Sequence, residues 1–240
     1  MFKPPLNTWP YDNYRPLWWS TLILLLLPAL VLALDYLNSN LGINGLETLE
    51  RTTGRWAVIL LILTLFITPA RRVLVQLFRH AGWHWGKRLP DWNFLMHMRR
   101  MLGLTCFFYS AAHAWVYLEF DLRWNWIVLS NELNEIPYIL AGVINLGLLT
   151  LLAVTSSDGM IRLLKRNWRR VHRLVYVIAL LAIAHWWWMS KPGDMRSLPY
   201  VLLLLILLAY RVLAWKGWLP LPGDDGMPAA PRDSSRPPQR

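Results

Sequence analysis

Three histidines of this 240-residue chain lie in long apolar segments, where an ionisable side chain is energetically costly. They are His113, His172 and His185, and the last two stand thirteen residues apart in one segment. Such a side chain usually faces the interior of a helix bundle and has a partner there. Imidazole is also a common ligand of metal ions and of haem iron. The three residues therefore predict either hydrogen bonds between helices or a metal centre.

The depths of the histidines favour haem. His113 and His185 lie toward the same end of their segments, whereas His172 lies about 20 Å further along the helix of His185. Ligation of one haem by two imidazoles needs two histidines at one depth on facing helices, and His172 would serve a second haem near the opposite face. However, thirteen residues leave His172 and His185 about 140° apart around an ideal helix, so spacing alone does not establish two stacked haems.

Two other chemistries are favoured less. A zinc ion shared by all three histidines is disfavoured, because His172 is too far from His113 and His185 to ligate the same ion. A proton relay is a further possibility, but no Asp or Glu lies in the middle of these segments to continue one.

Six apolar segments are long enough to position these histidines in a bilayer, which a helix of about 20 residues crosses. They are Leu17–Leu34, Arg55–Pro69, Met101–Phe120, Pro137–Val154, Val171–Met189 and Leu198–Trp215. The second is the shortest, and a kinked continuation past Pro69 would lengthen it. Hydrophobic residues make up 55% of the chain and charged residues 16%, below the ~25% charged residues of soluble domains. The sequence predicts an all-α integral membrane protein, a bundle of six transmembrane helices.

Basic residues gather in two connections, residues 69–100 and 155–173. Lys and Arg are retained on the cytoplasmic side of a membrane, so we expect both termini to be cytoplasmic. The net charge of +11 then reflects topology rather than a nucleic-acid partner. The expected organisation is a cytoplasmic N-terminal segment (1–16), a transmembrane domain (17–218) and a disordered, Pro-rich cytoplasmic tail (219–240).

Three stretches of the sequence carry a family resemblance. They read TGRWAVILLILTLFITPARR, MRRMLGLTCFFYSAAHAWVY and AVTSSDGMIRLLKRNWRRVHRLVYVIALLAIAHWWW. Together they resemble the MsrQ family (also called YedZ), the haem-binding membrane subunit of the bacterial periplasmic methionine sulfoxide reductase system. The resemblance covers roughly residues 15–215, and the family is similar in turn to the transmembrane domain of ferric reductases and NADPH oxidases.

The resemblance implies a haem b electron-transfer subunit in the bacterial inner membrane, with one or two haems. His113 and His185 would bind the outer haem, and His172 an inner one. In the oxidase relatives a second histidine ligates the inner haem at the position where this chain has Arg99. The sixth ligand of the inner haem is therefore open: His97, water or nothing.

Five arginines lie at the depth of an inner haem. They are candidates for charge-assisted hydrogen bonds to haem propionates or phosphate, or they serve positive-inside topology and contact lipid phosphates. These residues are Arg99, Arg100, Arg169, Arg170 and Arg173. Two positions depart from the family pattern, which usually has glycine at Lys165 and tyrosine at Trp186. Neither departure removes a ligand, but both could alter how the cytoplasmic end receives electrons.

The resemblance also implies partners. A periplasmic molybdopterin subunit, forming a heterodimer with this chain, would reduce methionine sulfoxide in oxidised proteins. Electrons would come from the quinone pool or a cytoplasmic flavin reductase, and FMN has been associated with the family. The tail after residue 218 is too short for the FAD and NADPH module of the oxidases, so we expect a separate donor. Two alternatives remain: a stand-alone ferric reductase-like or quinol-oxidising b-type cytochrome, and a transporter or scaffold whose histidines only join helices.

Overall fold

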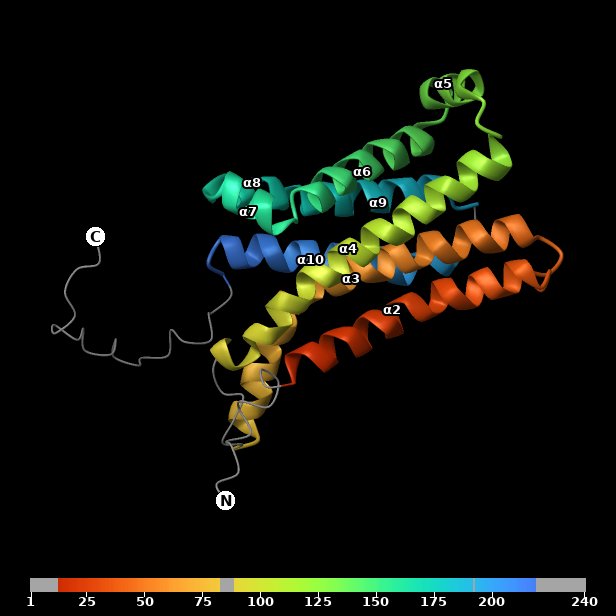
Figure 1. The fold of residues 1–240 in the computed structure, drawn as a ribbon. Helices are drawn as coiled ribbons and strands as arrows, with labels where there is room; N and C mark the ends of the chain where they lie inside the picture. The colour runs from red at the N-terminus through yellow and green to blue at the C-terminus, as the bar shows by residue number, and fades with distance from the viewer. Residues whose placement is uncertain (1–12, 83–88, 192, 219–240) are drawn as a thin grey trace.

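A computed structural model describes residues 13–82, 89–191 and 193–218, and all the regular structure in these ranges is helical (Figure 1). Six long helices run in alternating directions: α2 (Tyr14–Leu37), α3 (Gly45–His80), α4 (Asn93–Val116), α6 (Pro137–Val154), α9 (Val175–Met189) and α10 (Leu198–Trp215). Each belongs to a segment long and apolar enough to cross a membrane. The six predicted spans are confirmed, while the tail 219–240 and most of the N-terminal segment 1–16 lie outside the described residues.

Short helices connect the long ones and distinguish the two ends of the bundle. One end carries the π-helical turn η2 (Tyr117–Asp121), α5 (Trp126–Glu135) and η4 (Met195–Ser197). The other carries α7 (Asp158–Leu164), α8 (Arg166–Val171) and the 3₁₀ turn η3 (His172–Leu174), and η1 (Leu89–Trp92) precedes α4. Figure 1 shows α5 far from α7 and α8, so we call the two ends the α5 end and the α7 end.

Two helices extend further than the apolar runs that predicted them. The expected continuation of the second span past Pro69 is confirmed, because α3 runs on to His80. A proline inside a helix removes one backbone hydrogen bond and bends the helix, and Figure 1 shows the last turns of α3 turning away from the bundle. Helix α4 begins at Asn93, before the predicted start at Met101, so Arg99 and Arg100 are helical.

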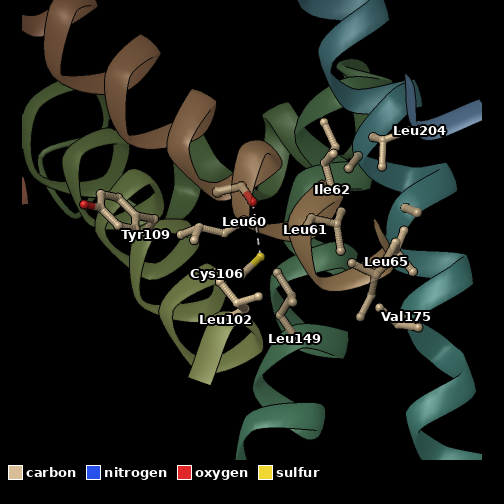
Figure 2. Packing of buried hydrophobic residues seen from close by; sticks show 14 of the residues in the cluster. Leu60, Leu61, Ile62, Leu65, Leu102, Cys106, Tyr109, Leu149, Val175 and Leu204 are labelled. Atoms are coloured by element: carbon tan, nitrogen blue, oxygen red, sulfur yellow. Dashed lines mark hydrogen bonds between the residues drawn. The ribbon is translucent and has the colours of Figure 1, made fainter. Parts of the chain in front are cut away.

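The core is formed by apolar side chains of α3, α4, α9 and α10, with contributions from α2 and α6 (Figure 2). The most extensive pairings join α3 to α4 and α6 to α9. Leu60 and Ile178 are completely buried there, and the buried Cys106 points its thiol at the Ala57 carbonyl, 3.3 Å away. Because lipid is as apolar as leucine, close van der Waals packing rather than exclusion of water holds such helices together.

Tyr109 fixes α2 against α4 through the α2 backbone. Its hydroxyl donates to the Leu25 carbonyl (2.8 Å) and accepts from the Ala29 amide (3.0 Å). These two groups belong to one turn of α2, next to Pro28. A side chain that bonds to the helix backbone beside a proline satisfies groups that lipid cannot, so Pro28 is tolerated in α2 at membrane depth.

Lys165 separates α7 from α8 and has a backbone conformation that suits glycine. Its φ of +46° and ψ of −116° lie in a region of backbone conformation that glycine adopts readily and that residues with a Cβ atom rarely adopt. The family resemblance implies glycine at this position. The departure therefore strains the backbone at the turn that leads into His172.

Replacing Lys165 by glycine should stabilise the protein by about 1 kcal/mol, because relief of about 1–3 kcal/mol of strain exceeds the entropic cost of glycine. Thermal unfolding in detergent, followed by circular dichroism, measures the effect. Lys165→Ala is the matched control, since it removes the charge but keeps Cβ. Equal midpoints for the glycine and alanine variants would show that the turn is not strained.

Candidate haem site

The structure brings His113 of α4 and His185 of α9 together near the α5 end. Their ring centres lie 6.2 Å apart, and the ring planes are inclined at 83°. An iron bound at about 2 Å from one nitrogen of each imidazole leaves the two ring centres about 6 Å apart. The spacing of the pair therefore fits one iron between the two rings.

Each of these imidazoles is held from behind by a backbone carbonyl of a neighbouring helix. Nδ1 of His113 lies 3.0 Å from the Glu50 carbonyl of α3, and Nδ1 of His185 lies 2.6 Å from the Tyr138 carbonyl of α6. A carbonyl oxygen can only accept a hydrogen bond, so Nδ1 carries the proton and Nε2 keeps its lone pair. This is the arrangement that ligating histidines usually have, and the residues present fit a haem iron.

The donor set also argues for haem over zinc. Among the residues that the structure describes, no three His, Cys, Asp or Glu side chains gather closely enough to hold a metal ion. Structural zinc sites use four protein ligands and catalytic ones use three, whereas haem iron needs only axial ligands from the protein. A histidine pair is therefore sufficient for haem and insufficient for zinc.

His172 has a different environment at the α7 end. Its Nδ1 lies 3.2 Å from the Trp168 carbonyl of the preceding turn, and its Nε2 lies 3.3 Å from the Ser156 hydroxyl. The ring stacks on Trp168, with 4.0 Å between ring centres. Both nitrogens thus have protein partners, and iron ligation at His172 would replace the Ser156 contact. Its role as a ligand stays a prediction.

The structure does not pair His97 with His172. His97 is exposed, its Nδ1 lies 3.1 Å from the Asn93 carbonyl, and its ring packs edge-on against Tyr14. A sixth ligand from His97 therefore stays a prediction that would need this side chain to leave its present contacts.

The angular offset between His172 and His185 is smaller than an ideal helix predicts. His172 opens the 3₁₀ turn η3, where each residue turns the chain by about 120° rather than 100°. Three such residues reduce the offset from about 140° to about 80°. The 3₁₀ turn thus brings the two imidazoles closer to one side of the helix.

The five predicted arginines lie around the α7 end but differ in their burial and in their partners. Arg99 is half-buried on α4, whereas Arg100 forms an exposed ion pair with Asp158, 2.5 Å between Nη1 and Oδ1. Three are exposed on α8 and η3: Arg169, Arg170 and Arg173. A surface pair such as Arg100–Asp158 contributes little stability. Contact between any of the five and a haem propionate or phosphate stays a prediction.

The sequence alone does not indicate several residues that shape these sites. Gly54 and Gly142 lie directly against the imidazoles of His113 and His185. Arg211 of α10 donates to the Thr68 hydroxyl (2.7 Å) and the Leu65 carbonyl (3.3 Å) of α3. Both glycines belong to apolar helices, where a small residue usually indicates only close helix packing. Their contact with the histidines becomes evident only once it is known which helices pair.

Comparison with known proteins identifies the class and then the family. The family described as ferric reductase like transmembrane component matches residues 53–183. Together with the six apolar helices, this match defines a multi-pass membrane protein of the ferric reductase-like class. No solved structure matches the chain.

Relatives of this chain carry the name protein-methionine-sulfoxide reductase heme-binding subunit MsrQ. The protein of Xanthomonas campestris pv. campestris (strain 8004) is 40% identical over 176 residues, covering 73% of this chain and 72% of the relative. That of Herminiimonas arsenicoxydans is 38% identical over 195 residues, covering 80% and 82%. The chain belongs to the MsrQ family, and the resemblance found in its sequence motifs is confirmed.

Proposed function

We propose that this chain is a haem b electron-transfer subunit that delivers electrons to a periplasmic methionine sulfoxide reductase. The observation that carries the proposal is the His113–His185 pair, with its 6.2 Å separation and its two Nδ1–carbonyl hydrogen bonds. The names of the relatives, which describe heme-binding subunits of such a reductase, support it. A haem bound there would supply one-electron transfer between ferric and ferrous iron.

The residues of the chain have distinct roles in this proposal. His113 and His185 would bind the iron, and the Glu50 and Tyr138 carbonyls, by accepting from Nδ1, leave Nε2 of each imidazole free to ligate it. Both histidines are partly buried, and the apolar core packs between the helices that carry them. The remaining chemistry, reduction of the sulfoxide, belongs to the partner.

The direction of electron flow follows from the proposed topology. The basic residues of α7, α8 and η3 support a cytoplasmic α7 end in an inner-membrane protein, with both termini on that side. His172 then lies near the electron source, and the His113–His185 pair lies near the periplasm. We propose membrane quinol as the donor, with a cytoplasmic flavin reductase or bound FMN as the other possible source. The acceptor would be a molybdopterin subunit that forms a heterodimer with this chain and repairs oxidised periplasmic proteins.

Reconstitution with the partner tests this function. Vesicles containing the wild-type chain, a quinol and a periplasmic methionine sulfoxide reductase should convert methionine sulfoxide to methionine. With the His185→Ala chain, the rate should fall to that of vesicles lacking the membrane subunit. Gly147→Ala, at a lipid-facing position of α6, is the control and should keep the wild-type rate. Quinol-driven reduction of a ferric chelate without any methionine formation would favour the stand-alone ferric reductase instead.

A further inference from the structure

Both imidazoles of the histidine pair rest against a glycine of the neighbouring helix. A Cβ added to Gly142 of α6 would lie 2.9 Å from Nδ1 and Cε1 of His185. A Cβ added to Gly54 of α3 would lie 3.3 Å from Nδ1 and 3.4 Å from Cε1 of His113. Contacts under 3.0 Å essentially never occur for real Cβ atoms, so the ring of His185 would have to move.

Each glycine stands one helical turn after the carbonyl that holds the histidine. Gly54 follows Glu50, and Gly142 follows Tyr138, each at i+4. The Cα–Cβ bond of a helical residue tilts toward the N-terminus, so a side chain at i+4 covers the carbonyl of residue i. Glycine leaves that carbonyl uncovered, and its second lone pair is free for a donor from another helix.

The same combination of a backbone carbonyl and a glycine at i+4 occurs twice in the bundle, once in each of its two most extensive helix pairings. Helix α3 presents a carbonyl and a glycine to the histidine of α4, and α6 presents the same combination to the histidine of α9. Packing alone does not require glycine on α6, because a Cβ at Gly147 of the same helix would meet nothing within 4 Å. On α6 the tight approach is therefore found at Gly142, behind the imidazole, and not at Gly147.

We propose that Gly54 and Gly142 are positioning residues that set the orientation and the tautomer of the two haem ligands. This inference rests on the proposed function, because it assumes that His113 and His185 bind haem iron. Each glycine leaves a backbone carbonyl accessible to Nδ1 of the histidine. The hydrogen bond to that carbonyl keeps the proton on Nδ1, so Nε2 keeps the lone pair that would ligate the iron. The hydrogen bond from Nδ1 also raises the basicity of the ligand, which favours ferric iron and lowers the midpoint potential.

Alanine variants test the device. Changes behind a ligating histidine typically cost about 10–100-fold in metal affinity, so Gly142→Ala should lower haem affinity at least about 10-fold. The haem that remains should have a more positive midpoint potential and a changed ferric EPR spectrum, which reports imidazole orientation. Gly54→Ala should have a smaller effect, because its contact is looser and the Thr53 hydroxyl, 3.5 Å from Nδ1 of His113, remains as an acceptor. Gly147→Ala is the matched control and should be unchanged in all three measurements.

A second experiment does not depend on the folding of Gly142→Ala. In His185→Gly protein supplied with haem, added imidazole can ligate the iron with one nitrogen and donate the other N–H to the Tyr138 carbonyl. The ligand 1-methylimidazole lacks that N–H. Restoration of the six-coordinate spectrum should therefore need about 10-fold less imidazole than 1-methylimidazole.

The outcomes separate this inference from the function on which it rests. If the wild-type protein binds haem and the histidine variants lose it, the haem ligation on which the inference rests stands. The inference is then overturned by a Gly142→Ala protein with wild-type haem affinity, potential and EPR spectrum. If that variant does not fold, equal effectiveness of the two imidazoles overturns the inference. A wild-type protein that binds no haem overturns the proposed function itself.

Discussion

Replacing His113 or His185 by alanine removes haem from the protein, and this is the largest effect that we expect from any single substitution. Even changes behind a ligating histidine cost about 10–100-fold in metal affinity, so loss of a ligand should lower haem content by more than 10-fold. No other His, Cys, Asp or Glu joins this pair in the described part of the chain, so a replacement ligand is lacking. Pyridine haemochrome quantification of purified protein measures the result.

The control for this experiment is His80→Ala. His80 is an exposed histidine at the end of α3, and its Nδ1 contacts the Gln76 carbonyl of its own helix. Its replacement should leave haem content unchanged. Full haem content in either the His113 or the His185 variant would contradict the assignment of that residue as a ligand.

Replacing His172 by alanine should separate haem binding from electron supply. The His113–His185 pair lies near the α5 end and should keep its haem, which dithionite reduces directly. Reduction by quinol should fall to background. The remaining haem site lies near the α5 end, so electrons from the α7 end would have to cross most of the ~30 Å hydrocarbon core in one step. Stopped-flow absorbance of the ferrous haem, with quinol and then dithionite as reductant, measures the two steps.

Ser156→Ala is the companion variant for His172. It removes the hydroxyl that contacts Nε2 without removing the imidazole, and it should preserve quinol-driven reduction. A His172→Ala protein that quinol reduces at the wild-type rate would show that electrons enter elsewhere, and it would remove His172 from the pathway.

The sequence predicts the large features of this protein because they depend on composition along one helix at a time. Apolar length predicts the six spans, and a costly imidazole in an apolar run identifies His113 and His185 as residues that need a partner. Helix ends were less predictable. Helix α3 starts at Gly45, before the predicted Arg55, and α4 starts before Met101, because polar residues beyond an apolar run can remain helical.

The features that the sequence could not predict depend on which helices pair. The glycines behind the two histidines lie on α3 and α6, far along the chain from the side chains that they accommodate. The conformation of Lys165 is a further example, because nothing in its side chain indicates a positive φ. The contacts of His172 with Ser156 and Trp168 arise from a tight 3₁₀ turn after α8 that periodicity does not reveal.

The most direct test is the dithionite-reduced minus oxidised absorbance spectrum of the purified wild-type protein, with pyridine haemochrome quantification per chain. We predict the spectrum of a b-type haem with two axial imidazoles and at least one haem per chain, held by His113 and His185. Two haems per chain would add the His172 site and complete the path across the membrane. A colourless protein would contradict the account and leave the three histidines as residues that only join helices.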